Sequence, residues 1–473
     1  MRCQQAPRFR RLTDQQCARL HQASLSILER TGVKLYHQPA VDLLRDAGGQ
    51  VSEGNRVRIP PALVERALET VPKELVLYDR YGKPAIRVGS HRTFFGPGSD
   101  CLNIIDHRTG ERRKPVLQDV VEGVTLCDAL PNMDFVMSMF LPTDVADTAS
   151  DRYQMEVMLN RTTKPLMYVT NDVAGCRDAV AMAEVVAGGG EPLRRKPLAA
   201  CYINVTTGLR HNEEALEKIL FLSEKGLPAA YIPVALGGAT APITLAGNVS
   251  IWNAGCLVGL TLSQLNRPGA PFITSGWGGS ALDMRTAVSA YVEPEKEFVV
   301  QELAHFYELP MFALGGCSDA KMPDQQAGIE AALTLSTKMM AGSHLVHDIG
   351  YLESGLTGSL AQVAICDEVI DWVRTSLEPV EITEETLALD LIDQVGPDGS
   401  FMEADHTLEH FRERWYPGLF ERYDYEGWRE RGSRDLGQRA ADRVEEILME
   451  HDPDPLPADL QEDLREIVLA AAS

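Results

Sequence analysis

The chain of 473 residues lacks the short motifs that identify the common hydrolases, metalloenzymes and nucleotide-binding proteins. It contains no CxxC pair, no HExxH helix, no GxSxG turn and no Walker A loop, and no GxGxxG follows the first predicted strand. These absences exclude a zinc site of ordinary ligand spacing, a serine hydrolase elbow and a P-loop. The chemistry therefore has to come from residues that are far apart in the sequence.

Basic residues are also scarce, since 45 Lys and Arg stand against 68 Asp and Glu, a net charge of −23. A chain this acidic is a poor general binder of nucleic acid or of an anionic membrane surface. The N-terminal residues lack an apolar run of signal-peptide length, and the most apolar stretch, 254–262, is too short to span a bilayer. We therefore expect neither a nucleic-acid partner nor a membrane segment.

The nine cysteines are dispersed and follow no ligand spacing. Such a set, in a chain that is 44% hydrophobic and can build a large core, is typical of reduced thiols in a cytoplasmic protein. We expect no metal and no cofactor to be bound tightly by the chain itself.

Eight short, nearly continuous apolar segments recur along the middle of the chain, as expected for strands that are covered on both faces. They begin at Arg92, Asp134, Pro165, Leu198, Pro228, Pro271, Pro310 and Ser343. Helical segments lie between them, such as the one that opens at Asn212 and closes at Gly226, and the one with Pro323 in its first turn. The alternation predicts an α/β fold, a (β/α)8 TIM barrel over residues 92–378.

The two flanks differ from the barrel segment. Residues 1–91 mix helical segments with short strands and glycines, and we expect an N-terminal α+β cap there. Residues 379–473 are charged and helical in pattern, which predicts a C-terminal helical extension that wraps the barrel or forms oligomer contacts. We expect a homo-oligomer.

Barrel enzymes place their active sites in the loops that follow the strands. Polar, aromatic and glycine residues gather at these predicted strand ends, namely Asp100, Tyr202, Asn204, Gly238, Trp277, Gly316 and His347. Each also has a structural interpretation, because glycines form turns, Trp277 can pack in the barrel wall, and His347 can be a satisfied structural histidine. Lys321 could form a Schiff base, although a solvated lysine beside two aspartates is the simpler interpretation.

Four longer blocks resemble the trimethylamine methyltransferase family. They begin FFGPGSDC, GGATAPIT, CSDAKMPD and HTLEHFRE, and they occupy residues 94–139, 237–276, 317–330 and 406–422. The resemblance implies a methyl transfer from a methylamine to a corrinoid (cobalamin) carried by a separate small protein. Ordinary residues fill the segment from Gly315 to Asp324, where the founding branch carries pyrrolysine. That difference favours the branch that acts on quaternary amines, with glycine betaine first, giving dimethylglycine. Proline betaine, carnitine, γ-butyrobetaine and trimethylamine are the alternatives.

A quaternary ammonium has no N–H to donate, so aromatic faces are its natural receptor. We expect Phe95, Tyr202 and Trp277 to hold it, although alternation along the strand leaves open whether Phe94 or Phe95 faces inward. Asn204 and His347 are the expected donors to a substrate carboxylate, and Asp100 is a further contact. Gly238 and Gly316 are predicted on the rim that faces the partner-borne corrinoid. No catalytic residue is assigned. A barrel lyase that uses Lys321 and a non-enzymatic amine binder are the other two functional hypotheses.

Overall fold

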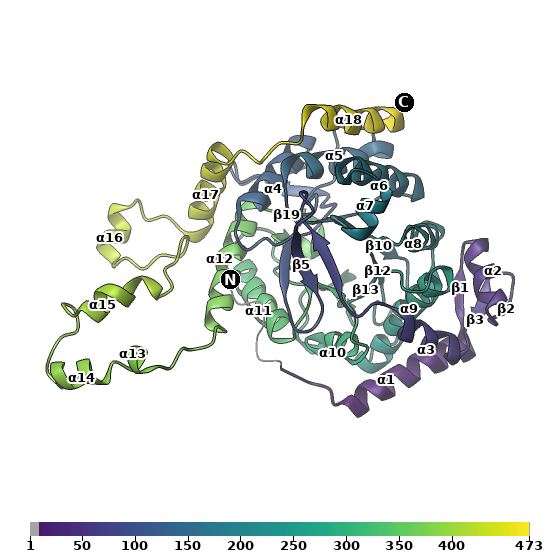
Figure 1. Cartoon of the computed structure of the whole chain (residues 1–473), viewed down its shortest axis with the longest axis horizontal. Helices are drawn as coiled ribbons and strands as arrows, with labels where there is room; N and C mark the ends of the chain where they lie inside the picture. The colour runs from purple at the N-terminus through teal and green to yellow at the C-terminus, as the bar shows by residue number, and fades with distance from the viewer. Residues whose placement is uncertain (1–8, 473) are drawn as a thin grey trace.

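The computed structural model describes residues 9–472, and its centre is a ring of parallel strands (Figure 1). Seven strands form one parallel sheet in the order β6-β17-β16-β13-β12-β10-β9. Their bounds are β6 Phe94–Pro97, β9 Leu166–Tyr168, β10 Ala199–Val205, β12 Ala229–Pro233, β13 Phe272–Ser275, β16 Met311–Leu314 and β17 Leu345–Ile349. Each corresponds to one of the eight predicted segments.

The remaining segment, 134–140, closes the ring between β6 and β9 without forming a regular strand. The Asp134 amide donates to the Phe95 carbonyl at 2.6 Å, and on the other side the Val136 amide donates to the Pro165 carbonyl at 3.0 Å. Regular pairing ends because Met139 has a φ of +60°, outside the strand region. The eight positions are therefore filled, which confirms the predicted (β/α)8 barrel.

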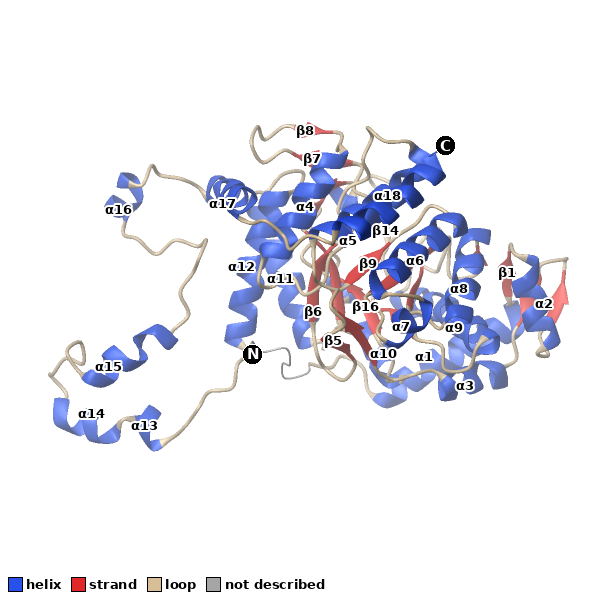
Figure 2. Cartoon of the chain, turned by 45° about the horizontal axis from the view of Figure 1, so that its top comes forward, coloured by secondary structure: helices blue, strands red, loops and turns tan. Residues whose placement is uncertain are grey.

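A helix follows each of the eight positions and covers the outside of the ring (Figure 2). The helices are α4 Leu117–Ala129, α5 Ser150–Arg161, α6 Val173–Ala187, α8 Glu213–Lys225, α9 Leu245–Asn266, α10 Val299–Phe306, α11 Gln325–Met340 and α12 Leu360–Ser376, with the short α7 Gly190–Arg195 after α6. Asn212 and Gly226 cap α8 as predicted. Pro323 is not in a first turn, because the N-cap of α11 is Asp324, whose carboxylate accepts the Ala327 amide at 3.1 Å.

Helix α9 is longer than the hydropathy pattern indicated. It is the one helix, among the residues described, with the length and composition to cross a membrane, but 78% of its most apolar window is buried inside the protein. It packs against α8, α1 (Asp14–Ser26) and α3 (Pro61–Thr70). The apolar composition therefore reflects a barrel helix that is covered on its outer side as well as its inner side.

The N-terminal part forms two small sheets. Strands β1 (Val33–Leu35), β2 (Gln50–Ser52) and β3 (Arg56–Arg58) join β11 (Arg210–His211), with α2 (Gln38–Asp46) beside them. The hairpin of β4 (Leu75–Tyr78) and β5 (Pro84–Val88) contributes four apolar side chains, including Leu77 and Ile86, to the cluster that fills the barrel interior with Phe94. The hairpin thus closes the end of the barrel where the strands begin.

The C-terminal part contains α13 (Glu384–Leu387), α14 (Leu389–Val395), α15 (Asp405–His410), α16 (Tyr425–Glu430), α17 (Leu436–Glu450) and α18 (Ala458–Ala472). Helix α17 packs on α12, and α18 packs on α5 and α6. Residues 379–414, which we call the arm, project away from the barrel at the left of Figures 1 and 2. The unit boundaries at 91/92 and 378/379 stay predictions.

Candidate active site at the mouth of the barrel

Aromatic rings line the upper part of the barrel interior. Tyr202, in β10, lies 5.2 Å from the Phe312 ring and 5.6 Å from the His347 ring, and His347 stacks on Phe312 at 3.8 Å. Trp277, after β13, packs against the same interior cluster as Tyr202. Three of the residues predicted from strand ends, Tyr202, Trp277 and His347, are therefore brought together.

A buried carboxylate lies beside these rings. Asp348, at the end of β17, has a φ of +70° and accepts a hydrogen bond from the Tyr291 hydroxyl. Its Oδ1 lies 3.5 Å from His347 Nε2. Burial, and after it the charges of Asp348 and Asp100, raise the pKa of Tyr202, so both carboxylates act on the same ring. Aromatic rings and buried carboxylates therefore meet at the ends of the strands.

Asp100 is held at this mouth by its backbone and by a helix. It has a φ of +62° just after β6, and its Oδ1 accepts from Gln154 Nε2 in α5 at 3.0 Å. Burial raises the pKa of Asp100. Gly98, two residues earlier, is required because a Cβ there would overlap the Asp348 carboxylate and lie 2.5 Å from Tyr351 Cζ.

The loop 276–298, which carries the hairpin of β14 (Leu282–Asp283) and β15 (Val288–Ser289), extends over the mouth. Asp319 fixes it by accepting the Tyr291 amide at 3.0 Å and the Ser354 hydroxyl at 2.8 Å. Lys296 holds the base of the loop, because its Nζ donates to Ser280 Oγ at 2.8 Å and to the Tyr291 carbonyl at 3.1 Å. Burial lowers the pKa of Lys296.

One hydrogen-bond donor in this loop has no acceptor. The indole Nε1 of Trp277 is buried and finds no partner among residues 9–472, while Lys296 Nζ lies 6.0 Å from the ring centroid. A buried N–H without a partner is costly, so this atom is suited to a ligand that brings an acceptor.

A polar cavity of about 350 Å³ opens beside Tyr202, between the ends of β9 and β10 and helix α8. Asn204 lines it, and Lys218 is buried at its wall, donating to the Thr170 carbonyl. Asn204 is an exposed residue at the edge of this cavity.

Two predicted site residues lie elsewhere. Phe95 points out of the barrel, under the Arg374 guanidinium at 5.1 Å, while Phe94 takes the inward position near the closed end. Gly316 does not face a partner, because it is buried and a Cβ there would lie 2.9 Å from Ile349 Cγ1. Both predictions are wrong, and of the two rim glycines only Gly238 is exposed.

The predicted role of His347 is also changed. Its Nδ1 donates to the Ala313 carbonyl at 2.6 Å, and burial lowers the pKa of the ring. The neutral ring then presents a lone pair at Nε2, so His347 is a poor donor for a carboxylate. Lys321 is exposed and donates to the Asp319 carbonyl at 2.6 Å, which is not the desolvated environment of a Schiff-base lysine.

Sequence reasoning missed Asp348, Tyr291 and Lys296. Asp348 directly follows His347 in the sequence, so its position beside a predicted site residue could have identified it. Tyr291 and Lys296 lie in a long loop and reach the mouth only through the tertiary fold. A possible metal-ligand cluster, His37 with Glu213 and Glu217, lies outside the barrel at distances of 3.9–4.0 Å and takes no part in this site.

A (β/α)8 barrel with aromatic and carboxylate side chains at its strand ends has the architecture of a barrel enzyme. Residues 2–471 match the family described as trimethylamine methyltransferase (MTTB). The chain belongs to this family and is a methyltransferase, which confirms the resemblance seen in the sequence.

Two relatives from Desulfitobacterium hafniense carry different names. The trimethylamine methyltransferase MttB of strain DCB-2 is 34% identical over 96% of this chain and 92% of its own length. The glycine betaine methyltransferase of strain Y51 is 29% identical over 98% of this chain and 97% of its own length. Among solved structures, the Methanosarcina barkeri monomethylamine methyltransferase MtmB aligns with a TM-score of 0.48 and 12% identity, covering 93% of this chain and 89% of that one.

Proposed function

We propose that the protein moves an N-methyl group from a quaternary amine, glycine betaine first, to a corrinoid carried by a separate small protein. The product from glycine betaine is dimethylglycine. The observation that carries this proposal is the cluster of aromatic rings and buried carboxylates at the strand ends, together with the unpartnered indole N–H of Trp277, because a betaine brings both a methylated cation and a carboxylate.

The cation is assigned to the rings of Tyr202, Trp277 and Tyr291. Each aromatic face contributes on the order of 0.5–2 kcal/mol to a desolvated ammonium. The carboxylate of Asp348 adds an attraction that does not depend on N–H donors, and Asp100 lies near enough to act on the same Tyr202 ring. Such a cavity is selective for permanent cations of small size.

The substrate carboxylate is assigned to Trp277 Nε1–H. A carboxylate in a dry cavity is costly unless a donor meets it, and this donor is buried and has no other acceptor. Lys296 lies 6.0 Å from the centroid of the same ring, but it is ion-paired with Glu293 at 3.4 Å, so the indole N–H is the donor on which this assignment depends. The cation and the anion of a betaine would thus lie at opposite sides of the cavity.

This chemistry needs little acid or base from the protein. A quaternary amine leaves as a neutral amine, so no group has to protonate it. The work of the chain is to orient one methyl group and to exclude water, which the loop 276–298 is placed to do. This agrees with the absence of an assigned catalytic residue.

The rim suits a protein partner that brings the methyl acceptor. Exposed apolar side chains occur in the loops after the strands, at Leu102, Ile243, Met284, Val288, Met322 and Leu356. Gly238 lies in the same rim, close to Met284. An apolar rim of this kind is typical of a docking surface. The corrinoid supplies the group that accepts the methyl, and we propose that the partner, not this chain, holds it. The eight described cysteines are buried and form no disulfide among the residues described, which supports a cytoplasmic location.

Trimethylamine is the second candidate. The relative of that name at 34% identity favours it, and Asp348 could accept the N–H of a protonated tertiary amine. Proline betaine, carnitine and γ-butyrobetaine remain alternatives of the same chemical kind. The panel of amines below separates them.

The test uses a corrinoid protein reduced to its cobalt(I) state and followed by absorbance while the enzyme and each amine are added. We expect the cobalt(I) band to disappear fastest with glycine betaine. Loss of the cobalt(I) band with trimethylamine alone would make trimethylamine the substrate in place of glycine betaine. If the band persists with every amine and with several corrinoid proteins, the proposed function is refuted.

A further inference from the structure

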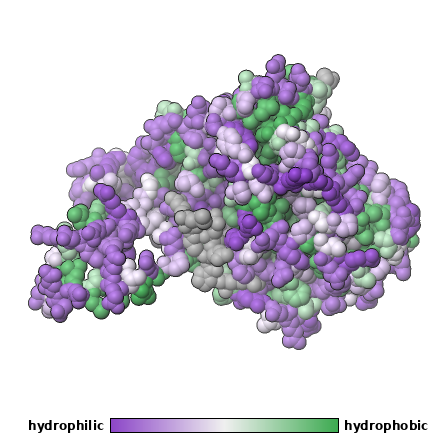
Figure 3. Space-filling view, viewed as in Figure 1, coloured by the Kyte–Doolittle hydropathy of each residue, from purple (hydrophilic) through white to green (hydrophobic). Residues whose placement is uncertain are grey.

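The arm, residues 379–414, has no hydrophobic core of its own. None of its residues, all of which the structure describes, is buried. It nevertheless carries large apolar side chains that face solvent, namely Val380, Ile382, Leu387, Leu389, Ile392, Phe401, Met402, Leu408 and Phe411. Val380 and Met402 are 83% and 85% exposed. Figure 3 shows hydrophobic patches on this projecting part at the left of the molecule.

Helices as short as those of the arm do not persist alone. Helices α13, α14 and α15 have between four and seven residues, well below the about 12–15 that an isolated helix needs. The ordering of this chain has an entropic cost that only burial of its apolar side chains can offset. A surface outside the arm must therefore cover it.

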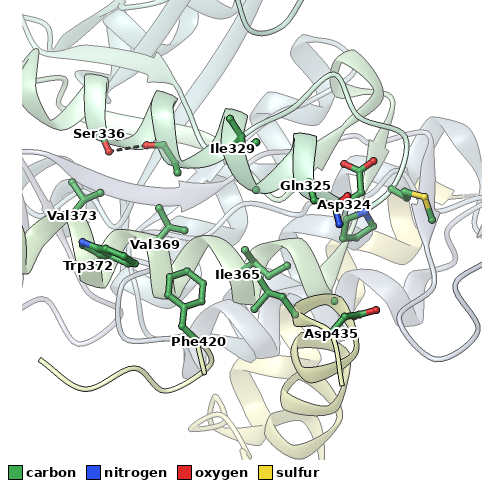
Figure 4. Close-up of a pocket in the computed structure, with 16 residues that line it drawn as sticks. Asp324, Gln325, Ile329, Ser336, Ile365, Val369, Trp372, Val373, Phe420 and Asp435 are labelled. Carbon is green, nitrogen blue, oxygen red and sulfur yellow. Dashed lines mark hydrogen bonds between the residues drawn. The ribbon is translucent and has the colours of Figure 1, made fainter. Parts of the chain in front are cut away.

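An unfilled apolar groove of about 740 Å³ lies between α11 and α12 (Figure 4). Ile329 lines it from α11, Trp372 and Val369 line it from α12, and Phe420 closes one side. Leu333, one turn beyond Ile329 on α11, is also exposed. The groove has the chemical character that the apolar side chains of the arm require.

The arm begins and ends at the edge of this groove. The centroid of the Trp372 ring lies 5.4 Å from that of Trp415 and 5.8 Å from that of Phe420. These contacts hold the segment that leads into the arm against the segment that leads out of it. The Trp415 indole donates to Asp371 Oδ2 at 2.9 Å. Since the base is fixed and the arm points away from its own groove, the arm is placed to reach a second molecule.

The match between arm and groove is apolar and not electrostatic. Residues 379–410 contain Asp and Glu but no Lys or Arg. The groove is lined mainly by apolar side chains, and its two charged lining residues are Asp324 and Asp435.

We propose that two copies of this chain exchange arms, each arm lying in the α11–α12 groove of the other copy. The contact is self-complementary, since every copy offers one arm and one groove, as a two-fold dimer requires. Arm and groove together provide more than the about 20–30 residues per partner of a standard stable interface. The groove runs along the outer helices α11 and α12 and reaches the rim at Met322 and Pro323, in the loop after β16.

The test is sedimentation equilibrium of the full chain with paired variants. We expect the wild type to be dimeric at low micromolar concentration, and we expect both the arm variant Met402→Asp/Leu408→Asp and the groove variant Ile329→Asp/Leu333→Asp to be monomeric. Met449→Asp, an equally exposed apolar side chain of α17, is the control and should stay dimeric. Circular dichroism melts check that each variant is folded.

Mixing the two variants gives the decisive result. A copy with an intact groove and a copy with an intact arm retain one matched contact, so a heterodimer should form although each variant alone is monomeric. A monomeric wild type would overturn the proposal. Hydrogen exchange would then show what covers the arm: protection in the monomer alone would indicate its own barrel, and protection only after a corrinoid protein is added would indicate that partner. Failure of the mixture to associate would overturn it too. None of these outcomes depends on which amine is the substrate.

Discussion

Replacing Trp277 by Phe separates the two roles that the site assigns to this residue. Phe keeps an aromatic face for the cation but removes Nε1–H, the buried donor without a partner. A hydrogen bond to a charged group is worth about 1.5–3 kcal/mol, so glycine betaine should bind about 10- to 150-fold more weakly. Tetramethylammonium, which has no carboxylate, should lose less than about fivefold, because only the ring face changes.

The assay is isothermal titration calorimetry of both ligands with wild type, Trp277→Phe and Trp277→Ala. The Ala variant should weaken both ligands, by a further about 1–2 kcal/mol, since the ring face is lost as well. Trp428→Phe, whose indole donates to the Arg434 carbonyl in the C-terminal part, is the matched control and should leave both affinities unchanged. Equal weakening of the two ligands by Trp277→Phe would refute the carboxylate assignment, and wild-type affinity in both Trp277 variants would refute the site.

Three further predictions concern the cavity wall and the barrel core. Gly98→Ala should displace the Asp348 carboxylate and lower kcat/KM by about tenfold or more, at a stability cost of about 1–3 kcal/mol in a thermal melt. Gly328→Ala, inside helix α11 with open space around it, should leave kcat/KM unchanged and raise the stability by about 0.5–1 kcal/mol. Asp348→Asn keeps the backbone conformation but should weaken tetramethylammonium binding about tenfold in calorimetry. The control is Asp283→Asn, a half-buried carboxylate that is ion-paired with Arg285. Burial lowers the pKa of His344 from 6.5 to about 4, so the neutral ring is the folded form and its stabilising contribution is lost as the pH falls from 6.5 toward 4. About 2 kcal/mol should be lost by pH 5, and His344→Gln should show a flatter dependence of unfolding on pH; an unchanged slope would contradict the buried neutral ring.

The barrel could be predicted from the sequence because each strand is a short apolar run and some of the helices, such as α8, begin at a capping polar residue and end at a glycine. The second segment kept its place in the ring but not its regular form, since Asp134 is tied to Arg374 by an ion pair at 2.6 Å and Met139 leaves the strand conformation. Helix α9 is longer than the apolar stretch 254–262 because polar residues flank that stretch, among them Asn253, Ser263 and Gln264. Gly259 is needed there, since a Cβ would overlap the Tyr231 ring of the barrel wall.

The site was predictable only in part. Tyr202, Trp277 and His347 could be found because barrel geometry brings strand ends together. Phe95 was wrongly chosen because adjacent residues of a strand point to opposite faces, and the sequence alone does not say which of the two faces the barrel interior. Tyr291 depends on a loop whose path is set by Asp319, a contact that no local pattern predicts.

The central claim is the transfer of a methyl group from a betaine to a partner-borne corrinoid. The most direct measurement is mass spectrometry after one turnover of glycine betaine that carries deuterated N-methyl groups, with a reduced corrinoid protein as acceptor. The account predicts one labelled methyl group on the corrinoid for each dimethylglycine formed, and loss of both products when the enzyme is omitted. Dimethylglycine without label on the corrinoid, or label delivered from trimethylamine but not from glycine betaine, would contradict it.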